Sequence, residues 1–366
     1  MKKVILCTNI PAPYSVDFYN ELGKYCDLTV LYERYTSAER DAAWVGDKAI
    51  NFEEVYLKLT PFGVEQARGS ELRKYIKHHQ SDVLIFANYS SPASLEAIIW
   101  CRMHNRKYII CWDGGFYKED SFLKKLFKKF VLCGAEKHLI SCNELNKYLL
   151  SLGVPQHKIN KYPFTSIREK DIVSVDNVTM EEKLRLRREL GIEEKNVVLS
   201  VGQMIPRKGI DILIKAAVGL NNSVGVYIVG GEPSKEMVEL KEQLKLSNVH
   251  FVDFKVKEEL KKYYSAADVF VFPTREDIWG LVVNEAMSRG LPVISSNRSI
   301  AAQEMIIDGE NGFMVEPENE KSLHNAILTF LNDDSISANM FKNCLKISKE
   351  YTIEAMAKSQ AEILAL

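Results

Sequence analysis

The sequence lacks the features that mark membrane-spanning and secreted proteins. No apolar run approaches the roughly 18 residues that a membrane-spanning helix needs. The apolar part of the first residues, Val4 to Cys7, is too short for a signal peptide. The seven cysteines are scattered and odd in number, which favours free thiols in a reducing compartment over a disulfide framework. We therefore expect a cytoplasmic protein that does not span a membrane.

Several signatures of catalysis and binding are also missing. The sequence has no Gly-x-Ser-x-Gly elbow, no Gly-x-Gly-x-x-Gly fingerprint and no Walker P-loop. The seven histidines show no His-x3-His spacing, and Cys101-x2-His104 lacks a second pair, so we expect no metal site. Base-stacking aromatic residues interleaved with basic ones are not evident, which argues against a nucleic-acid partner.

Length and charge indicate two domains of different electrostatic character. The 366 residues, 46% of them hydrophobic, are enough for two cores. The net charge of −1 hides an asymmetry, because residues 1–168 hold 24 Lys and Arg against 18 Asp and Glu. A basic first half suits an acidic partner or an anionic membrane surface, although so modest an excess is also typical of plain solubility.

Short apolar runs alternate with helical patterns along most of the chain, which predicts parallel α/β domains. The polar stretch from Thr165 to Glu182 lacks apolar periodicity and reads as a linker. We expect a first domain over residues 1–165 and a second over 166–349. The strands predicted before this linker are Lys3 to Thr8, Leu28 to Tyr32, Val83 to Ala87 and Tyr108 to Trp112, and those after it include Val197 to Gly202, Val224 to Gly231, Val249 to Phe254 and Asp268 to Phe272.

The most informative stretch runs from residue 273 to residue 294. The apolar run Asp268 to Phe272 leads into a loop with two acids, then a glycine, a helical segment and a second apolar run. This order is typical of a βαβ unit. Ligands of open α/β sheets bind at the carboxyl ends of the strands, so the loop is the candidate site.

The spacing within this loop suits a nucleotide sugar. A helix that starts near Gly280 leaves the N–H groups of Trp279, Gly280 and Leu281 without intrahelical acceptors, which favours an anion there. Asp277 and Glu285 lie on either side of that start, roughly 8–12 Å apart at the rise of an α-helix. Sugar hydroxyls, a diphosphate and ribose hydroxyls fit this layout. An ordinary helix with one capping Asp and one solvated Glu has the same spacing.

A second loop supplies the positive charge. The strand from Val197 to Gly202 is followed by Gln203 and then by Arg207-Lys208-Gly209. A buried strand that delivers two cations to a flexible loop is a plausible phosphate clamp.

Together these residues resemble the family 4 retaining glycosyltransferases. The segment from Asp277 to Glu285 is similar to the Glu-x7-Glu element of that family, in which the first acid binds the donor sugar, the Gly-Leu backbone holds the diphosphate and the second acid binds the ribose. Asp277 is one methylene shorter than the usual Glu, and Glu276 competes for its role. The resemblance also implies that the segment beginning at Gly202 contacts the diphosphate, with Lys208 matching outright. Gln203 replaces the usual Arg, so one charge contact is either missing or supplied by Arg207.

The resemblance implies a fold and an activity. The fold is GT-B, with two Rossmann-like parallel-sheet domains that face each other across a cleft and a final helix, about 350–366, that packs back on the first domain. The activity is transfer of a sugar from a nucleotide-diphosphate donor, with UDP favoured, to a hydroxyl of a glycan or lipid-linked acceptor in cell-surface polysaccharide synthesis. No cofactor beyond the donor is implied. The sequence has no Asp-x-Asp, so the metal-diphosphate site of the other main glycosyltransferase fold is not supported.

Asp113 is the catalytic candidate of the first domain, beside Lys208 and Asp277 of the second. It follows a predicted strand and precedes two glycines, and many relatives carry a His or Glu near this point. A turn-forming Asp-Gly is the alternative.

Two other functions fit the same site. A nucleotide-sugar epimerase on the same scaffold would need carboxylates or a His at the sugar C2. A non-catalytic nucleotide-sugar-binding subunit would keep the site without turnover.

The pattern of residues 122–130 predicts a helix that contacts a membrane. Apolar residues at 122, 123, 126, 127 and 130 share one helical face, beside Lys124, Lys125, Lys128 and Lys129. Such a helix suits peripheral docking on an anionic membrane, at its inner face for a cytoplasmic protein. A surface helix whose apolar face packs on its own domain has the same sequence pattern.

Overall fold

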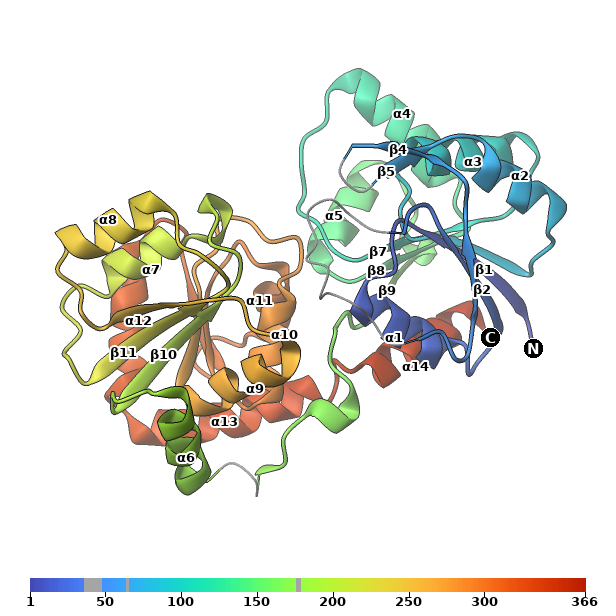
Figure 1. The fold of residues 1–366 in the computed structure, drawn as a ribbon. Helices are drawn as coiled ribbons and strands as arrows, with labels where there is room; N and C mark the ends of the chain where they lie inside the picture. Colours follow the sequence, from blue (N-terminus) through green and yellow to red (C-terminus); the bar gives the residue numbers. More distant parts are fainter. Residues whose placement is uncertain (36–47, 64–65, 176–178) are drawn as a thin grey trace. The chain divides into compact units, whose positions relative to one another are not determined.

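The computed structural model describes residues 1–35, 48–63, 66–175 and 179–366, and the expected linker is therefore described except for residues 176–178. The chain divides into two compact units (Figure 1). The first comprises residues Met1–Ser166 and Thr352–Leu366, and the second comprises Ile167–Tyr351. No helix in the described part of the chain is both long and apolar enough to cross a bilayer.

The first unit is built on a seven-stranded parallel sheet of order β3-β2-β1-β6-β7-β8-β9. Its strands are β1 (Lys3–Thr8), β2 (Asp27–Tyr32), β3 (Glu53–Tyr56), β6 (Val83–Phe86), β7 (Ile109–Trp112), β8 (Lys137–Ile140) and β9 (Ile159–Lys161), and a separate hairpin pairs β4 (Thr60–Phe62) with β5 (Gln66–Arg68). Its helices are α1 (Pro13–Leu22), α2 (Glu71–His78), α3 (Pro92–Met103), α4 (Phe122–Cys133), α5 (Asn143–Ser151) and α14 (Ile353–Leu364). The C-terminal helix α14 packs beside α1 within this unit (Figure 1).

The second unit is built on a six-stranded parallel sheet of order β12-β11-β10-β13-β14-β15. Its strands are β10 (Asn196–Val201), β11 (Val224–Val229), β12 (Val249–Val252), β13 (Val269–Phe272), β14 (Val293–Ser296) and β15 (Gly312–Val315). Its helices are α6 (Met180–Leu190), α7 (Ile210–Ala216), α8 (Lys235–Gln243), α9 (Lys257–Ala266), α10 (Leu281–Ser288), α11 (Ile300–Met305), α12 (Glu320–Leu331) and α13 (Asp334–Ser348).

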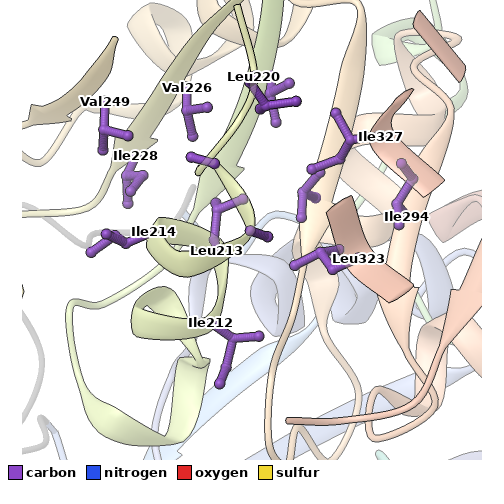
Figure 2. Close-up of a cluster of buried hydrophobic side chains, with 14 of the residues drawn as sticks. Ile212, Leu213, Ile214, Leu220, Val226, Ile228, Val249, Ile294, Leu323 and Ile327 are labelled. Carbon is purple, nitrogen blue, oxygen red and sulfur yellow. The ribbon is translucent and has the colours of Figure 1, made fainter. Parts of the chain in front are cut away.

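The core of the second unit lies between this sheet and the helices α7 and α12. Ile228 and Val226 of β11 and Ile294 of β14 meet Leu213 of α7 and Ile327 of α12 in one buried cluster (Figure 2). Every residue of β11 is buried, as expected for a parallel strand covered on both faces. This packing fixes the strand ends from which the loops of the site emerge.

The strand order places a topological switch point between β10 and β13. The chain runs from β10 outwards to β11 and β12, then returns to β13 on the other side of β10 and continues to β14 and β15. Ligands of open α/β sheets bind beside such a switch point, at the carboxyl ends of the strands. The loops that leave β10 and β13 are therefore the expected position of a site.

The segment from Ile306 to Val315 is hairpin-like in sequence, with glycine turns, and this expectation was only half right. Gly309 does lie in a turn, with a φ of +77°. The second half of the segment, however, is β15, which joins the main sheet parallel to β14, with Val293 opposite Gly312. Gly312 allows this pairing because a Cβ there would lie 2.0 Å from the carbonyl oxygen of Val293.

Candidate functional site

The candidate site of the second unit is formed by the loops after β10 and β13. The first loop ends in a short 3-10 turn, Pro206–Lys208, and in Gly209, whose φ is +68°. A Cβ on Gly209 would lie 2.1 Å from the carbonyl oxygen of Pro273. The two loops thus touch through their backbones, and only a glycine permits this approach.

Lys208 and Asp277 form an ion pair between these loops. Both side chains are largely buried, with exposed fractions of 13% and 11%. The Lys208 Nζ also lies 5.2 Å from the centre of the Phe272 ring, a cation–π distance. The structure thus brings two of the three catalytic candidates from sequence into direct contact.

Arg207 lies on the outer side of the same pair. Its side chain is half exposed, donates to the backbone oxygen of Glu276 at 2.9 Å and lies 3.8 Å from the Asp277 carboxylate. Gly202 lies beside the stem of Lys208, since a Cβ there would be 3.7 Å from the Lys208 Cδ. Gln203 is exposed at the start of the loop.

The two neighbouring acids point in different directions. The Glu276 carboxylate lies 3.3 Å from the guanidinium of Arg298, whereas Asp277 faces Lys208. The backbone N–H of Asp277 donates to the carbonyl of Arg298 at 2.8 Å and holds this loop in place. Asp277 is therefore the acid that contacts Lys208 and lies near Arg207.

Helix α10 begins at the loop that carries these acids. Gly280 has a φ of +101°, and a Cβ there would lie 2.8 Å from the Ser299 Oγ. Gly280 and Leu281 begin the helix, so their N–H groups have no intrahelical acceptor. Trp279 differs from them, because its N–H lies 3.4 Å from the Asp277 Oδ1 and its indole is buried, donating to the Asn284 side chain at 2.8 Å.

Glu285 lies on α10 about one turn from its start and accepts a hydrogen bond from the Tyr264 hydroxyl at 2.9 Å. Burial raises the pKa of the Glu285 carboxyl, and the Tyr264 hydrogen bond partly opposes that rise. Sequence reasoning found Glu285 but assigned Tyr264 only to the core. Tyr264 is indeed buried, yet it also orients the acid.

Arg275 is a positioning residue that sequence reasoning missed. Its guanidinium binds both carboxylate oxygens of Asp211 at 2.8 Å and also pairs with Glu318. Its backbone N–H donates to the carbonyl of Arg207 at 2.8 Å. Arg275 therefore ties the β13 loop to the β10 loop and to α7. The sequence signal near this site was the Arg207-Lys208 pair, and it gave no indication that Arg275 pairs with Asp211 and Glu318.

Asp113, the third catalytic candidate, lies in the first unit directly after β7. It lines a small pocket with aromatic residues that include Tyr14, Tyr19 and Phe164. Asp113 is solvent-accessible, yet the protein around it displaces enough water to raise its pKa from 3.8 to about 6, an effect that the Tyr162 hydroxyl partly opposes. Asp113 is thus a carboxyl that titrates near neutral pH at the carboxyl edge of the first sheet.

Comparisons with known proteins cover the residues of this site. The model of the family "Glycosyl transferases group 1" matches residues 182–346, which lie within the second unit and include the Lys208 and Asp277 loops. One relative is the N,N'-diacetylbacillosaminyl-diphospho-undecaprenol alpha-1,3-N-acetylgalactosaminyltransferase of Campylobacter jejuni. It is 24% identical over 340 residues, which are 90% of this chain and 88% of that protein.

Solved structures match both units together. Anabaena HepE in complex with UDP has a TM-score of 0.79 at 18% identity, over 100% of both chains. A glycosyltransferase from Rickettsia africae has a TM-score of 0.76 at 16% identity, over 99% of this chain and 98% of its own. These likenesses confirm the fold class expected from the sequence. The second unit matches the glycosyl transferases group 1 model, and the chain has the α/β GT-B fold with two parallel-sheet domains.

Proposed function

We propose that this protein is a family 4 retaining glycosyltransferase that transfers a sugar from a nucleotide-diphosphate donor to a hydroxyl acceptor. The observation that carries the proposal is the Lys208–Asp277 pair at the switch point of the second sheet, next to the N-terminus of α10. Cations, free helix amides and a carboxylate are the groups that a diphosphate and a sugar require.

In this proposal the diphosphate takes the position between the cations and α10. Lys208 and Arg207 neutralise the charge that develops on the leaving diphosphate, and the N–H groups of Gly280 and Leu281 donate to its oxygens. The two cations fill the role that a divalent ion plays in other transferases, so no metal or further cofactor is required.

The two acids then bind the ends of the donor. Lys208 exchanges its bond to Asp277 for the diphosphate, which frees Asp277 to accept from the sugar hydroxyls. Glu285, oriented by Tyr264, accepts from the ribose hydroxyls. The turn after β12, which includes the exposed Phe254, contacts the base in this proposal.

The leaving group departs from, and the acceptor attacks, the same face of the sugar, which retains the configuration at the anomeric carbon. Asp113 is the catalytic carboxyl that we propose in the first unit. A UDP-sugar is the favoured donor, supported by the UDP complex of HepE. A glycan or lipid-linked acceptor is supported by the Campylobacter relative, whose name gives a diphospho-undecaprenol-linked sugar. Such an acceptor would hold a cytoplasmic enzyme at the inner face of a membrane, as a peripheral protein in polysaccharide synthesis.

The test is incubation with a panel of UDP-, GDP- and ADP-sugars, with and without membrane extract as a source of acceptor. Transfer releases free nucleotide, and we expect this with a UDP-sugar. A changed sugar without nucleotide release would instead indicate an epimerase. Saturable binding without either change would indicate a binding subunit.

A further inference from the structure

Helix α4 presents an apolar face that its own domain does not cover. All residues from 121 to 127 are exposed, and α4 lies on the outside of the first unit (Figure 1). Five large apolar side chains of this short helix are exposed: Phe122 by 80%, Leu123 by 76%, Leu126 by 58%, Phe127 by 45% and Phe130 by 45%. Apolar patches of this kind mark interaction sites. The packing alternative that the sequence left open therefore does not hold for this face.

The arrangement of charge around this face is that of an interfacial helix. At 3.6 residues per turn, the five apolar side chains fall within an arc of about 140° that runs from Phe122 to Phe127. Lys129 and Lys124 lie just outside the two ends of this arc, by about 20° and 60° respectively. Lysines in such places extend their stems along an apolar surface and keep their ammonium groups at its polar boundary.

The opposite side of α4 anchors it to the domain. Lys128 pairs with Asp120 at 2.9 Å and with the Tyr148 hydroxyl at 2.6 Å. Val131 and Leu132 at the end of the helix are buried. The helix is thus held at its base while its first two turns project with the apolar face outward.

We propose that this face of α4 docks the protein on an anionic lipid bilayer. The occupant follows from charge. The helix bears four lysines and no acid, and the Asp120 carboxylate that pairs with Lys124 and Lys128 offsets only part of this charge. A second copy of α4 would therefore be repelled, whereas anionic head groups attract the helix. The excess of basic residues in the first half of the chain adds to this attraction. The inference deepens the proposed function, on which it rests for the lipid-linked acceptor, but the docking itself depends on α4 alone.

Co-sedimentation with vesicles tests the proposal. We expect the wild type to bind vesicles of phosphatidylcholine with phosphatidylglycerol, to bind pure phosphatidylcholine weakly, and to be released by salt. The variant Phe122→Asn/Leu126→Asn should bind at least about tenfold more weakly, because it removes two insertable side chains. Both residues are exposed, so the fold is kept. The matched control is Met180→Asn/Leu184→Asn, which removes an equally spaced exposed apolar pair from α6 and should bind as the wild type does.

A charge pair tests the electrostatic part. Lys124→Gln/Lys129→Gln should weaken binding to the anionic vesicles about tenfold or more at low salt, whereas Lys342→Gln/Lys346→Gln on α13 should not.

UDP binding is measured on every variant. The docking proposal would be overturned if the wild type bound UDP but no anionic vesicles. It would also be overturned if the α4 variants bound these vesicles as well as the wild type does. A dimer that the Phe122 and Leu126 substitutions dissociate, without vesicle binding, would assign the face to a second copy and also overturn the proposal. Vesicle binding without any nucleotide release would count against the transferase activity alone.

Discussion

Lys208 and Asp277 join the carboxyl ends of β10 and β13 through a largely buried ion pair. The pair lies in the loops beyond the strand ends and is not part of the buried hydrophobic cluster of the second unit. In the proposed mechanism the two groups separate when donor binds.

Replacement of Lys208 by Met should therefore abolish transfer while the fold is kept. We expect nucleotide release from a UDP-sugar to fall about 100-fold or more, since a preorganised cation on the leaving group is lost. The control is Lys170→Met, which removes an exposed lysine outside the site. Release within about threefold of the wild-type rate would exclude the leaving-group role.

Tyr264→Phe should weaken donor binding by acting through Glu285. The loss of one hydrogen bond to a carboxylate, about 1.5–3 kcal/mol, predicts UDP binding weaker by roughly tenfold or more in calorimetry. The control Tyr263→Phe removes the hydroxyl of the neighbouring residue on α9. Equal losses in both variants would indicate a general effect on the helix.

The hydrogen bond between Tyr264 and Glu285 also predicts how donor binding depends on pH. Burial raises the pKa of Glu285, and an ionised Glu285 is the stronger acceptor for ribose hydroxyls. Affinity for UDP should therefore be full at high pH and fall as the pH drops through this raised pKa. Because the Tyr264 hydrogen bond lowers that pKa, the fall should begin at a higher pH in Tyr264→Phe. Superimposable pH profiles for the two proteins would disprove the link.

Asp113→Asn should separate catalysis from stability. The pKa of Asp113 is raised to about 6, so ionisation of Asp113 disfavours the folded state at pH 7. The variant should melt at a higher temperature than the wild type at pH 7, and this difference should disappear as the pH falls below about 4, where Asp113 is protonated in both states. Transfer by the variant should be strongly reduced at every pH. A variant with normal transfer would remove Asp113 from the mechanism.

Sequence patterns were sufficient for strands β10 to β14 of the second unit and for the loops with Lys208 and Asp277. A buried parallel strand is a continuous apolar run, as Val269–Phe272 is, and its end locates the site. The partners of Arg275 were not predictable, because Asp211 and Glu318 are 64 and 43 residues away in the chain. Tyr264 was hidden for a related reason. Its ring belongs to the apolar face of α9, and nothing in the local spacing shows where its hydroxyl points.

The exposure of the apolar face of α4 could likewise not be predicted from the sequence. Its apolar periodicity is the same whether the face is packed or exposed, and only the exposed fractions of side chains such as Phe122 and Leu126 distinguish the two cases. The glycines between Ile306 and Val315 read as turns in the sequence, which was only half right. Gly309 does lie in a turn, with a φ of +77°, whereas Gly312 belongs to β15 and is needed for close approach to Val293.

Among the substitutions considered, replacement of Arg187 should cause the largest loss of stability. Its guanidinium is buried in α6, pairs with Asp268 at 2.7 Å and donates to the carbonyls of Ala266 and Lys195. Asp268 in turn accepts from the N–H of Val197 at the start of β10, so the network holds α6 against the sheet. Arg187→Ala should lower the free energy of unfolding by about 3–5 kcal/mol, since it leaves the Asp268 charge with only Lys183 as a cationic partner. Urea unfolding measures this loss against Arg188→Ala, which removes an exposed arginine from the next position and should cost less than about 1 kcal/mol. Equal losses in the two variants would mean that the helix needs the arginine stem and not the buried pair.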